Sequence, residues 1–450
     1  SKSRTNAWLR ALTYNDGGTL IGASNTLYWT YGGFEEGAEI SIQYSTDLGA
    51  SWVTVAADMA VTNGMYVWDV NGLEPMACYW RVVSEDDTNV WDRNDQRVGV
   101  SGGRVTYYVN DTNTVGDVYC AGVGDVGNTG LTPESPMNTV TGLLAKYTLS
   151  GGDTVYVDTG VYTNQMIYVA ANDSGSWTSG YMTVQGSTNY AAGGTVFDYP
   201  GAYIIYINGA NYVRVNDVTA RRGEHGVNVN SAASVELNRV KALNNTYGFR
   251  VGGASGLLMK GCVGAWNAYG IYFYSNNAKW ENGVLWENTQ AAVCKYYNDG
   301  QIGVLHSVIR QLSGVVYGGV LASQYGDYNV FDLGSAATVG GASYSKVADW
   351  QKTYNQEWHS TAAGADLANP TNLDFHPKSV EGRWDIAGGL WVTDEVQSVC
   401  IDMGNPASAW TNEPEPNGGR MNVGAHGNVW DASKSRTNAW LRALTYNDGG

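Results

Sequence analysis

One short segment combines the residue types that acid–base chemistry requires. Arg221, Arg222, Glu224 and His225 are near neighbours, and Asp217 shortly precedes them. A turn between two strands would project the base His225 and the carboxylate of Glu224 together. Such a pair can abstract a proton from a bound substrate. A charged turn that faces solvent explains the same residues without any chemistry. We favour this second interpretation, so the sequence predicts no catalytic residue.

Three residues are candidates for holding a cation. Asp125 and Asn128 lie in a Gly-rich stretch, and Asp153 follows further along the chain. Their side-chain oxygens are the ligands that Ca²⁺ prefers. Turn formation explains them as well, because Asp and Asn side chains hydrogen-bond to nearby backbone in loops. The sequence therefore predicts neither a metal site nor a cofactor, and Ca²⁺ is the one ion to test.

A third set of residues suits the recognition of sugars. Tyr206, Arg250, Tyr272 and Tyr274 fall at outward positions of a repeating pattern. Aromatic rings offer flat apolar faces on which sugar rings stack, and a guanidinium donates hydrogen bonds. Exposed aromatic residues also form contacts between subunits. Glycan binding and subunit contact are both open interpretations of this stripe.

The stripe belongs to a repeat of 22 residues. Blocks starting at Ile204, Gly226, Gly248 and Gly270 share the same alternation of apolar and polar residues. One apolar column contains Ile205, Val227, Phe249, Ile271, Val293 and Val315, and a second contains Val218, Val240, Cys262 and Val284. A coil of this length holds three short strands, and its apolar residues are buried only when coils stack. The pattern predicts a right-handed parallel β-helix.

Two local details follow from this register. Asn216, Asn238 and Asn282 are expected to stack their amides from coil to coil at a tight turn. Strict spacing would place Lys295 in the core, so we expect a one-residue slip that instead turns Cys294 and Tyr296 inward.

The first part of the chain has a different pattern. Ile40–Tyr44 alternates with period two, a turn follows, and Ser51–Val55 returns, so Glu39–Ala56 is predicted to be a hairpin of a β-sandwich. The segment Leu73-Glu74-Pro75-Met76-Ala77-Cys78-Tyr79 resembles the tyrosine corner of fibronectin type III domains. Such modules are spacers or weak binders, so the resemblance implies no activity.

Both ends of the predicted β-helix resemble one group of proteins. Asp125–Pro133 followed by an expected short helix over 135–146 is similar to the N-terminal cap of pectate-lyase-like β-helix proteins of bacterial surfaces. Ser398–Gly404 and Glu413–Ala425 resemble the closing segment of that group. A Trp- and Tyr-rich stretch, Ser345–His359, is expected to form a loop or helix that covers the stack. The resemblance implies the fold rather than an activity.

That group includes polysaccharide lyases and hydrolases. The lyases use an acidic calcium cluster with a basic residue, and the hydrolases use two or three close aspartates. His225-Gly226 resembles the G-H-G element of polygalacturonases, but Glu224 replaces its first Gly and the predicted β-helix contains no N-T-D or Asp-Asp partner. A lyase or hydrolase of acidic glycans is thus an alternative that lacks a complete set of residues.

The amino-acid composition narrows the possible fold and function classes further. The chain has 450 residues, 58 Gly, 31 Tyr and a net charge of −16, which favours turn-rich β-structure and argues against nucleic acid as a partner. An apolar run of about 18 residues, which would span a membrane as a helix, does not occur in this window. Five scattered cysteines, Cys78, Cys120, Cys262, Cys294 and Cys400, predict neither a disulfide scaffold nor a zinc pair.

The sequence SKSRTNAWLRALTYNDGG occurs twice, at Ser1–Gly18 and at Ser433–Gly450. We interpret this as a tandem repeat with a 432-residue period, although a duplicated tag or a cloning concatemer gives the same pattern. The domains are then a sandwich over 1–103, a β-helix over 104–432 and the start of the next repeat over 433–450.

The expected function follows from this organisation. We expect a structural module of an extracellular filament or giant cell-surface protein, whose partners are adjacent copies joined end to end. A polysaccharide-binding adhesin is the first alternative.

Overall fold

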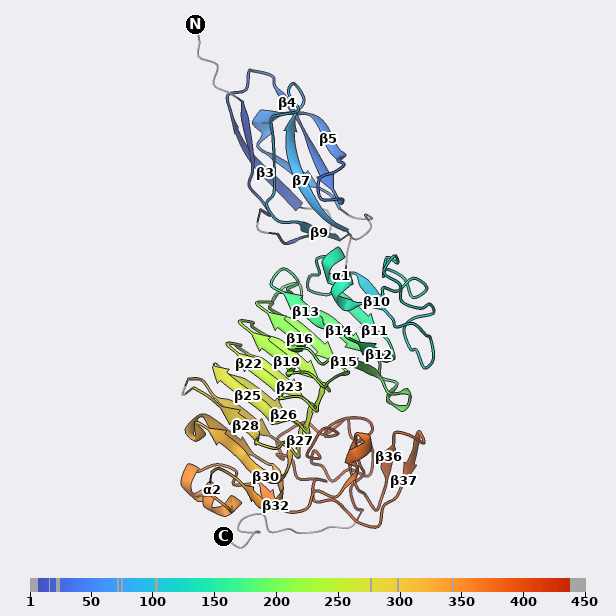
Figure 1. Cartoon of the computed structure of the whole chain (residues 1–450), viewed down its shortest axis with the longest axis vertical. Helices are drawn as coiled ribbons and strands as arrows, with labels where there is room; N and C mark the ends of the chain where they lie inside the picture. The colour runs from blue at the N-terminus through green and yellow to red at the C-terminus, as the bar shows by residue number, and fades with distance from the viewer. Residues whose placement is uncertain are drawn as a thin grey trace. The chain divides into compact units, whose positions relative to one another are not determined.

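The computed structural model describes residues 7–15, 17–21, 25–70, 73, 76–101, 104–275, 277–297, 299–341 and 344–437. The chain divides into two compact units. The first comprises 1–107, 142–154 and 171–182, and it contains a β-sandwich. The second comprises the remaining residues and contains most of a parallel β-helix (Figure 1). Neither α-helix of the described part is long and apolar enough to span a membrane.

The sandwich is built from two sheets. One has the order β1 (Trp8–Ala11), β3 (Asn25–Gly32) and β6 (Met65–Trp68). The other has the order β2 (Thr19–Ile21), β9 (Val98–Ser101), β7 (Met76–Ser84), β4 (Glu39–Ser45) and β5 (Val53–Ala60), with β8 (Trp91–Arg93) paired to β7. The antiparallel pair of β4 and β5 confirms the predicted hairpin.

Three tryptophans form the centre of the sandwich. Trp29, Trp68 and Trp80 are buried, with at most 3% of each exposed. The indole of Trp29 donates to the Val61 carbonyl at 3.0 Å, so its one polar atom is satisfied. Tyr79 is half-buried under the Arg93 guanidinium, 3.8 Å from the ring centre. Glu74 and Pro75 of the tyrosine-corner resemblance lie outside the described residues.

The β-helix has three sheets of parallel strands, and each full coil contributes one strand to each sheet. The first sheet contains β13 (Ile167–Ala170), β16 (Tyr203–Asn208), β19 (His225–Asn230), β22 (Tyr247–Gly252), β25 (Tyr269–Ser275) and β28 (Ala291–Lys295). The second contains β10 (Thr106–Val109), β11 (Thr154–Val157), β14 (Met182–Gly186), β17 (Val213–Asn216), β20 (Val235–Asn238), β23 (Leu257–Lys260), β26 (Ala278–Glu281), β29 (Ile302–Leu305) and β31 (Gln324–Asp327).

The third sheet contains β12 (Gly160–Thr163), β15 (Thr195–Asp198), β18 (Val218–Arg221), β21 (Lys241–Leu243), β24 (Val263–Ala265), β27 (Val284–Trp286), β32 (Val330–Thr338) and β33 (Thr361–Ala362). The long strand β30 (Val308–Gly319) pairs with β27 in the third sheet and with β28 in the first, so it joins the two. The prediction of a right-handed parallel solenoid with coils of about 22 residues is confirmed.

The predicted inward column is confirmed over most of its length. Ile205, Val227, Phe249, Ile271 and Val293 face one another in register, and each is at most 1% exposed. Burying each such side chain contributes about 1.5–3 kcal/mol. The column then continues to Tyr317, not to Val315 as the strict spacing predicted. This coil is two residues longer than the repeat, since Val284 pairs with Val308 and Val293 with Tyr317, and the register moves accordingly.

One coil is one residue shorter than the 22-residue repeat, and two other predictions are therefore wrong. Val284 lies opposite Val263 and not opposite Cys262, although all of these are buried. For the same reason Glu281, not Asn282, lies opposite Lys260. The predicted amide stack is confirmed only between Asn216 and Asn238, where the donor–acceptor distance is 2.9 Å.

The expected slip at Lys295 does not occur. Lys295 stays in register with Phe273, and its side chain is fully buried. Its ammonium group lies 4.7 Å from the Phe273 ring centre and donates to the Tyr274 carbonyl at 3.2 Å and to the Asp299 carbonyl at 2.5 Å. The lysine is tolerated because it ends its strand, where the long apolar stem brings the charge to backbone oxygens. Tyr296 is accordingly 54% exposed.

Two short helices belong to the ends of the β-helix. The predicted N-terminal helix is confirmed in shorter form as α1 (Val140–Lys146). The Trp- and Tyr-rich stretch forms α2 (Val347–Tyr354), which lies beside β30 and β32 in Figure 1. Trp350 of α2 is fully buried and stacks on Tyr317 with ring centres 5.1 Å apart.

The closing segment, which spans residues 367–432 and is longer than the two stretches named from the sequence, covers the outer surface of the third sheet. It contains β34 (Leu367–Asn369), β35 (Asp374–Pro377), β36 (Arg383–Asp385) and β37 (Leu390–Val392). Leu243, Val263, Trp286, Val308 and Val330 of the sheet share a buried cluster with Phe375, Cys400, Met403 and Val423 of the segment. Strands β24 and β27 are thus buried on both faces, which explains their continuous run of apolar and small residues.

Candidate functional site

The charged segment Arg221–His225 is divided between two sheets. Arg221 ends β18, and its guanidinium lies 2.9 Å from the Asp198 carboxylate, which also pairs with Arg222. His225 begins β19 and packs between Tyr203 and Tyr247, with ring centres 5.0 Å away on each side. Burial lowers the pKa of His225. His225 Nε2 lies 3.9 Å from Glu224 Oε1, so this base and carboxylate are near each other. The two arginines pair with Asp198 instead, so the segment as a whole does not converge on a common point.

Asp217 is also committed to neighbouring groups. The Arg239 guanidinium donates two hydrogen bonds to its carboxylate at 2.6 and 2.7 Å, and Gln185 donates a third at 2.8 Å. Tyr190 makes a further contact with it. The acid–base arrangement that the segment suggested is therefore replaced by a bidentate ion pair on a different coil.

Hydrogen bonds to the backbone account for the three candidate cation ligands. Asp125 accepts from the Gly127 amide at 2.7 Å, and the Asn128 side chain donates to the Pro136 carbonyl at 2.8 Å. Asp153 is 1% exposed and accepts from the amides of Val105 and Ser150, both at 2.9 Å. Their geometry matches the turn-forming interpretation.

The tyrosine stripe forms one continuous aromatic face on the first sheet. Tyr206, Arg250 and Tyr272 lie in one outward column, interrupted by Asn228. Beside them runs a second column, which sequence reasoning missed even though it repeats at the same spacing: Tyr203, His225, Tyr247 and Tyr269. We refer to these two columns with Tyr274, Tyr296 and Tyr297 as the aromatic face.

Most rings of the aromatic face cover one another. Tyr247 and Tyr269 stack with centres 5.4 Å apart and an interplanar angle of 11°, and both meet Tyr272 edge to face. The Arg250 guanidinium lies 4.5 Å from the centre of Tyr274. Such cross-strand pairs stabilise a sheet. Tyr296 and Tyr297, 54% and 53% exposed, are the most open rings of this face.

The start of the second copy of the repeated segment is built into the closing segment. Ser433 and Ser435 are each 1% exposed. The Lys434 amide donates to the Gly382 carbonyl and the Ser435 amide to the Pro416 carbonyl, both at 2.8 Å. The Ser435 hydroxyl donates to Asp402 at 2.7 Å. These residues are therefore an ordered part of the β-helix unit.

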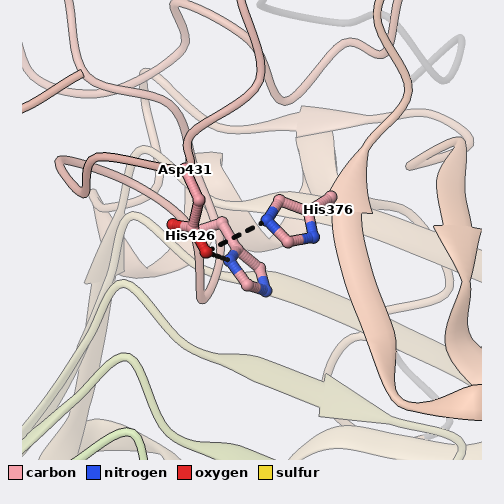
Figure 2. Close-up of side chains that lie close together, drawn as sticks. All are labelled: His376, His426 and Asp431. Atoms are coloured by element: carbon pink, nitrogen blue, oxygen red, sulfur yellow. Dashed lines mark ion pairs between the residues drawn. The ribbon is translucent and has the colours of Figure 1, made fainter. Parts of the chain in front are cut away.

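A cluster of two histidines and an aspartate lies near this point (Figure 2). His376 is on β35, and His426 and Asp431 are on the loop that follows Val423. His376 Nε2 is 3.4 Å and His426 Nδ1 is 3.6 Å from the same oxygen, Asp431 Oδ2. The two imidazole rings stack with centres 3.4 Å apart. Two nitrogens and one oxygen thus approach a single point.

A second set of charged groups holds His376 in place. Its Nδ1 lies 2.6 Å from Asp374 Oδ1. Arg383 on β36 donates to the other Asp374 oxygen at 3.1 Å and forms a second ion pair with Asp394 at 3.1 Å. The imidazole is fully buried, so its ring orientation is fixed by these partners.

The pKa values of the two histidines shift in opposite directions. Burial alone would lower the pKa of His376, but the adjacent carboxylates of Asp374 and Asp431 raise it. Burial and the neighbouring His376 lower the pKa of His426. The two histidines hold the pKa of Asp431 well below its usual range despite its burial. Asp431 is therefore a carboxylate at neutral pH.

No family model, curated protein or solved structure matches this chain. The residues themselves are the only guide to function. Sequence reasoning could have found the Tyr203–Tyr269 column, because its spacing is that of the core columns. The approach of His376 to His426 has no such signal, since His376 lies on the short strand β35 and His426 in a loop, with no shared period.

Proposed function

We propose that this chain is a structural module of an extracellular filament or large cell-surface protein, in which copies join end to end through the repeated segment. We also assign, as part of this proposal, the sandwich to the fibronectin type III-like modules and the β-helix to the pectate-lyase-like surface proteins. The Leu73–Tyr79 and Asp125–Pro133 resemblances support these assignments.

One observation carries the proposal: the two halves of the repeated segment serve different units. In the first copy, Trp8–Ala11 forms strand β1 of the sandwich, and Leu9 and Ala11 enter its core. In the second copy, Ser433–Ser435 is bonded into the closing segment of the β-helix. A segment that ends one domain and begins another is suited to be a joint between modules.

The joint would be short. Trp440 in the second copy corresponds to Trp8 in the first, so only Arg436–Ala439 separate Ser435 from the next expected strand. Four extended residues span at most about 14 Å. A connection of this length, without a Gly- or Pro-rich stretch, holds successive modules close together and limits their relative motion.

The test is a two-module chain, made of residues 1–432 followed by 1–450, imaged by negative-stain electron microscopy. We expect a narrow distribution of centre-to-centre spacings. The matched control carries a flexible Gly-Ser insertion after Thr437, which leaves Ser433–Ser435 intact and should broaden the distribution. Equal breadth in both chains would overturn the joint, and isolated single modules in the native assembly would overturn the filament.

Polysaccharide binding is a second candidate, favoured by the open rings of Tyr296 and Tyr297 beside Tyr274. A glycan array with the native chain tests it. We expect Tyr297→Ala to abolish any binding, whereas Tyr28→Ala, which removes a 44% exposed tyrosine of the sandwich, should leave binding intact. Equal loss in both variants would contradict a site on the aromatic face.

A further inference from the structure

We propose that His376, His426 and Asp431 bind a divalent transition-metal ion, with Zn²⁺ the best match to this donor set. Two imidazole nitrogens and one carboxylate oxygen are ligands that zinc accepts, whereas Ca²⁺ and Mg²⁺ require mainly oxygen. All three residues lie in the β-helix unit. This site is independent of the joint between modules.

The distances fit ligands that share an ion better than they fit direct hydrogen bonds. Zinc lies about 2.0–2.2 Å from nitrogen and oxygen ligands, so two ligands in tetrahedral geometry are about 3.3–3.5 Å apart. The separations from Asp431 Oδ2 to His376 Nε2 and His426 Nδ1 are 3.4 and 3.6 Å. Hydrogen bonds from nitrogen to oxygen are shorter, at about 2.7–3.2 Å.

The orientation of His376 supplies an independent observation. Its Nε2 is buried and has no hydrogen-bond partner, although the side chain is fully enclosed. Its Nδ1 faces the Asp374 carboxylate at 2.6 Å. A carboxylate at one ring nitrogen fixes the other as the metal ligand, and such partners are a regular feature of histidine–metal sites. The unsatisfied nitrogen therefore points to a missing partner at the centre of the cluster.

Access and coordination number are also compatible with an ion. The side chains of His426 and Asp431 are 19% and 15% exposed, so the cluster opens to solvent on the side of the loop. Three protein ligands leave one tetrahedral position for water. Arg383 is shared between Asp374 and Asp394 beside His376, so the surroundings of the cluster, with Asp431, are net negative and suit a cation.

The ion would fasten the closing loop to β35. Ser433, two residues beyond Asp431, donates from its hydroxyl to the carbonyl of Pro377, the neighbour of His376. Metal ligation at His376 and Asp431 would add a second connection between the same two stretches. We therefore expect a structural role, in which binding raises the stability of the β-helix unit.

The experiment uses the full chain, freed of metal with a chelator and dialysed. Isothermal titration with Zn²⁺ should give one equivalent per chain, and Co²⁺ should give the visible absorption of a tetrahedral site. His426→Gln and Asp431→Asn should weaken Zn²⁺ binding at least tenfold, and Asp374→Asn by about 10–100-fold with unchanged stoichiometry.

The matched control is His359→Gln, which removes a histidine that pairs with Asp327 at 2.8 Å away from the cluster. This variant should bind Zn²⁺ like the native chain. Thermal denaturation with and without Zn²⁺ covers the case of a poorly folded variant, because bound ligand raises the Tm only where the site is present. Absence of stoichiometric binding in the native chain, or equal binding in His426→Gln, would overturn the proposal.

Discussion

Tyr317 donates a hydrogen bond of 2.6 Å to Glu357, and both side chains are fully buried beside α2. The Asn329 amide donates to both carboxyl oxygens at 3.1 and 2.9 Å, and Ser360 contacts the second oxygen. Among the described residues, no arginine, lysine or histidine forms an ion pair with Glu357. Burial accordingly raises the pKa of Glu357 from 4.5 to about 7.

This pair predicts a stability that falls as the pH rises. Between about pH 4.5 and 7 the native carboxyl keeps a proton that the unfolded chain releases, so its stabilising contribution is complete below 4.5 and lost above 7. The shift corresponds to about 3 kcal/mol. Urea denaturation at pH 5 and pH 8 should show the loss, and Glu357→Gln should reduce it.

A control separates this effect from general charge repulsion. Glu224→Gln removes an acidic group whose side chain is 57% exposed, and it should leave the pH dependence unchanged. Some slope should persist in Glu357→Gln, because burial also raises the pKa of Glu413 to about 7. An unchanged slope in Glu357→Gln would contradict the assignment.

A buried amide ladder predicts a large effect of one asparagine. Asn267 donates to Asn288 Oδ1 at 3.1 Å and to the Ala242 carbonyl at 3.0 Å, and it accepts from the Asn245 amide at 2.9 Å. Asn267→Ala removes these buried side-chain hydrogen bonds, so we expect a loss of about 2–4 kcal/mol in urea denaturation. Asn230→Ala, in the partly exposed pair with Asn208, should lose about 1 kcal/mol. Equal losses would show that the ladder has no special role.

The aromatic face predicts a difference between two tyrosines. Tyr247→Ala removes contacts with His225, Tyr269 and Tyr272. Because each aromatic pair contributes about 0.5–1.5 kcal/mol, we expect a loss of about 2–3 kcal/mol in unfolding free energy. Tyr297→Ala at an exposed position should lose less than about 1 kcal/mol. A reversed order would indicate that the stacked rings do not stabilise the sheet.

Thiol chemistry should follow burial. Cys78, Cys262 and Cys400 are fully buried, and burial raises the pKa of both Cys78 and Cys262 to about 12. Since the thiolate is the reactive form, these residues should resist alkylation in the native chain and react after unfolding in guanidinium. The chain is treated with iodoacetamide before and after unfolding, and mass spectrometry of its peptides measures the alkylation of each cysteine. Native labelling of Cys262 would contradict its place in the core.

The sequence predicted the core columns because stacking imposes a fixed spacing on every coil. The column from Ile205 to Val293 could be placed from that spacing alone. The position of Val315 could not, because a change in coil length shows only when the strand pairing is known. The error at Lys295 has another cause. Hydropathy treats lysine as one polar unit, but its stem and its charge occupy different surroundings.

The candidate metal cluster was beyond sequence reasoning for a third reason. His376 and His426 meet because the closing segment folds back on the third sheet, and irregular backbone carries no period from which this approach could be predicted. The aromatic face was partly predicted: the outward positions of Tyr206 and Tyr272 were found, but the neighbouring Tyr247 was missed.

The burial of the third sheet by the closing segment also orders events during synthesis. Leu243, Val263 and Trp286 leave the ribosome before Phe375 and Val423, the residues that cover them. Coils can stack locally as they emerge, but this apolar surface remains exposed to water until the closing segment is synthesised and docks. Nascent chains of this protein should therefore pass through a stage in which they bind chaperones or associate with one another, and that stage ends when the closing segment docks.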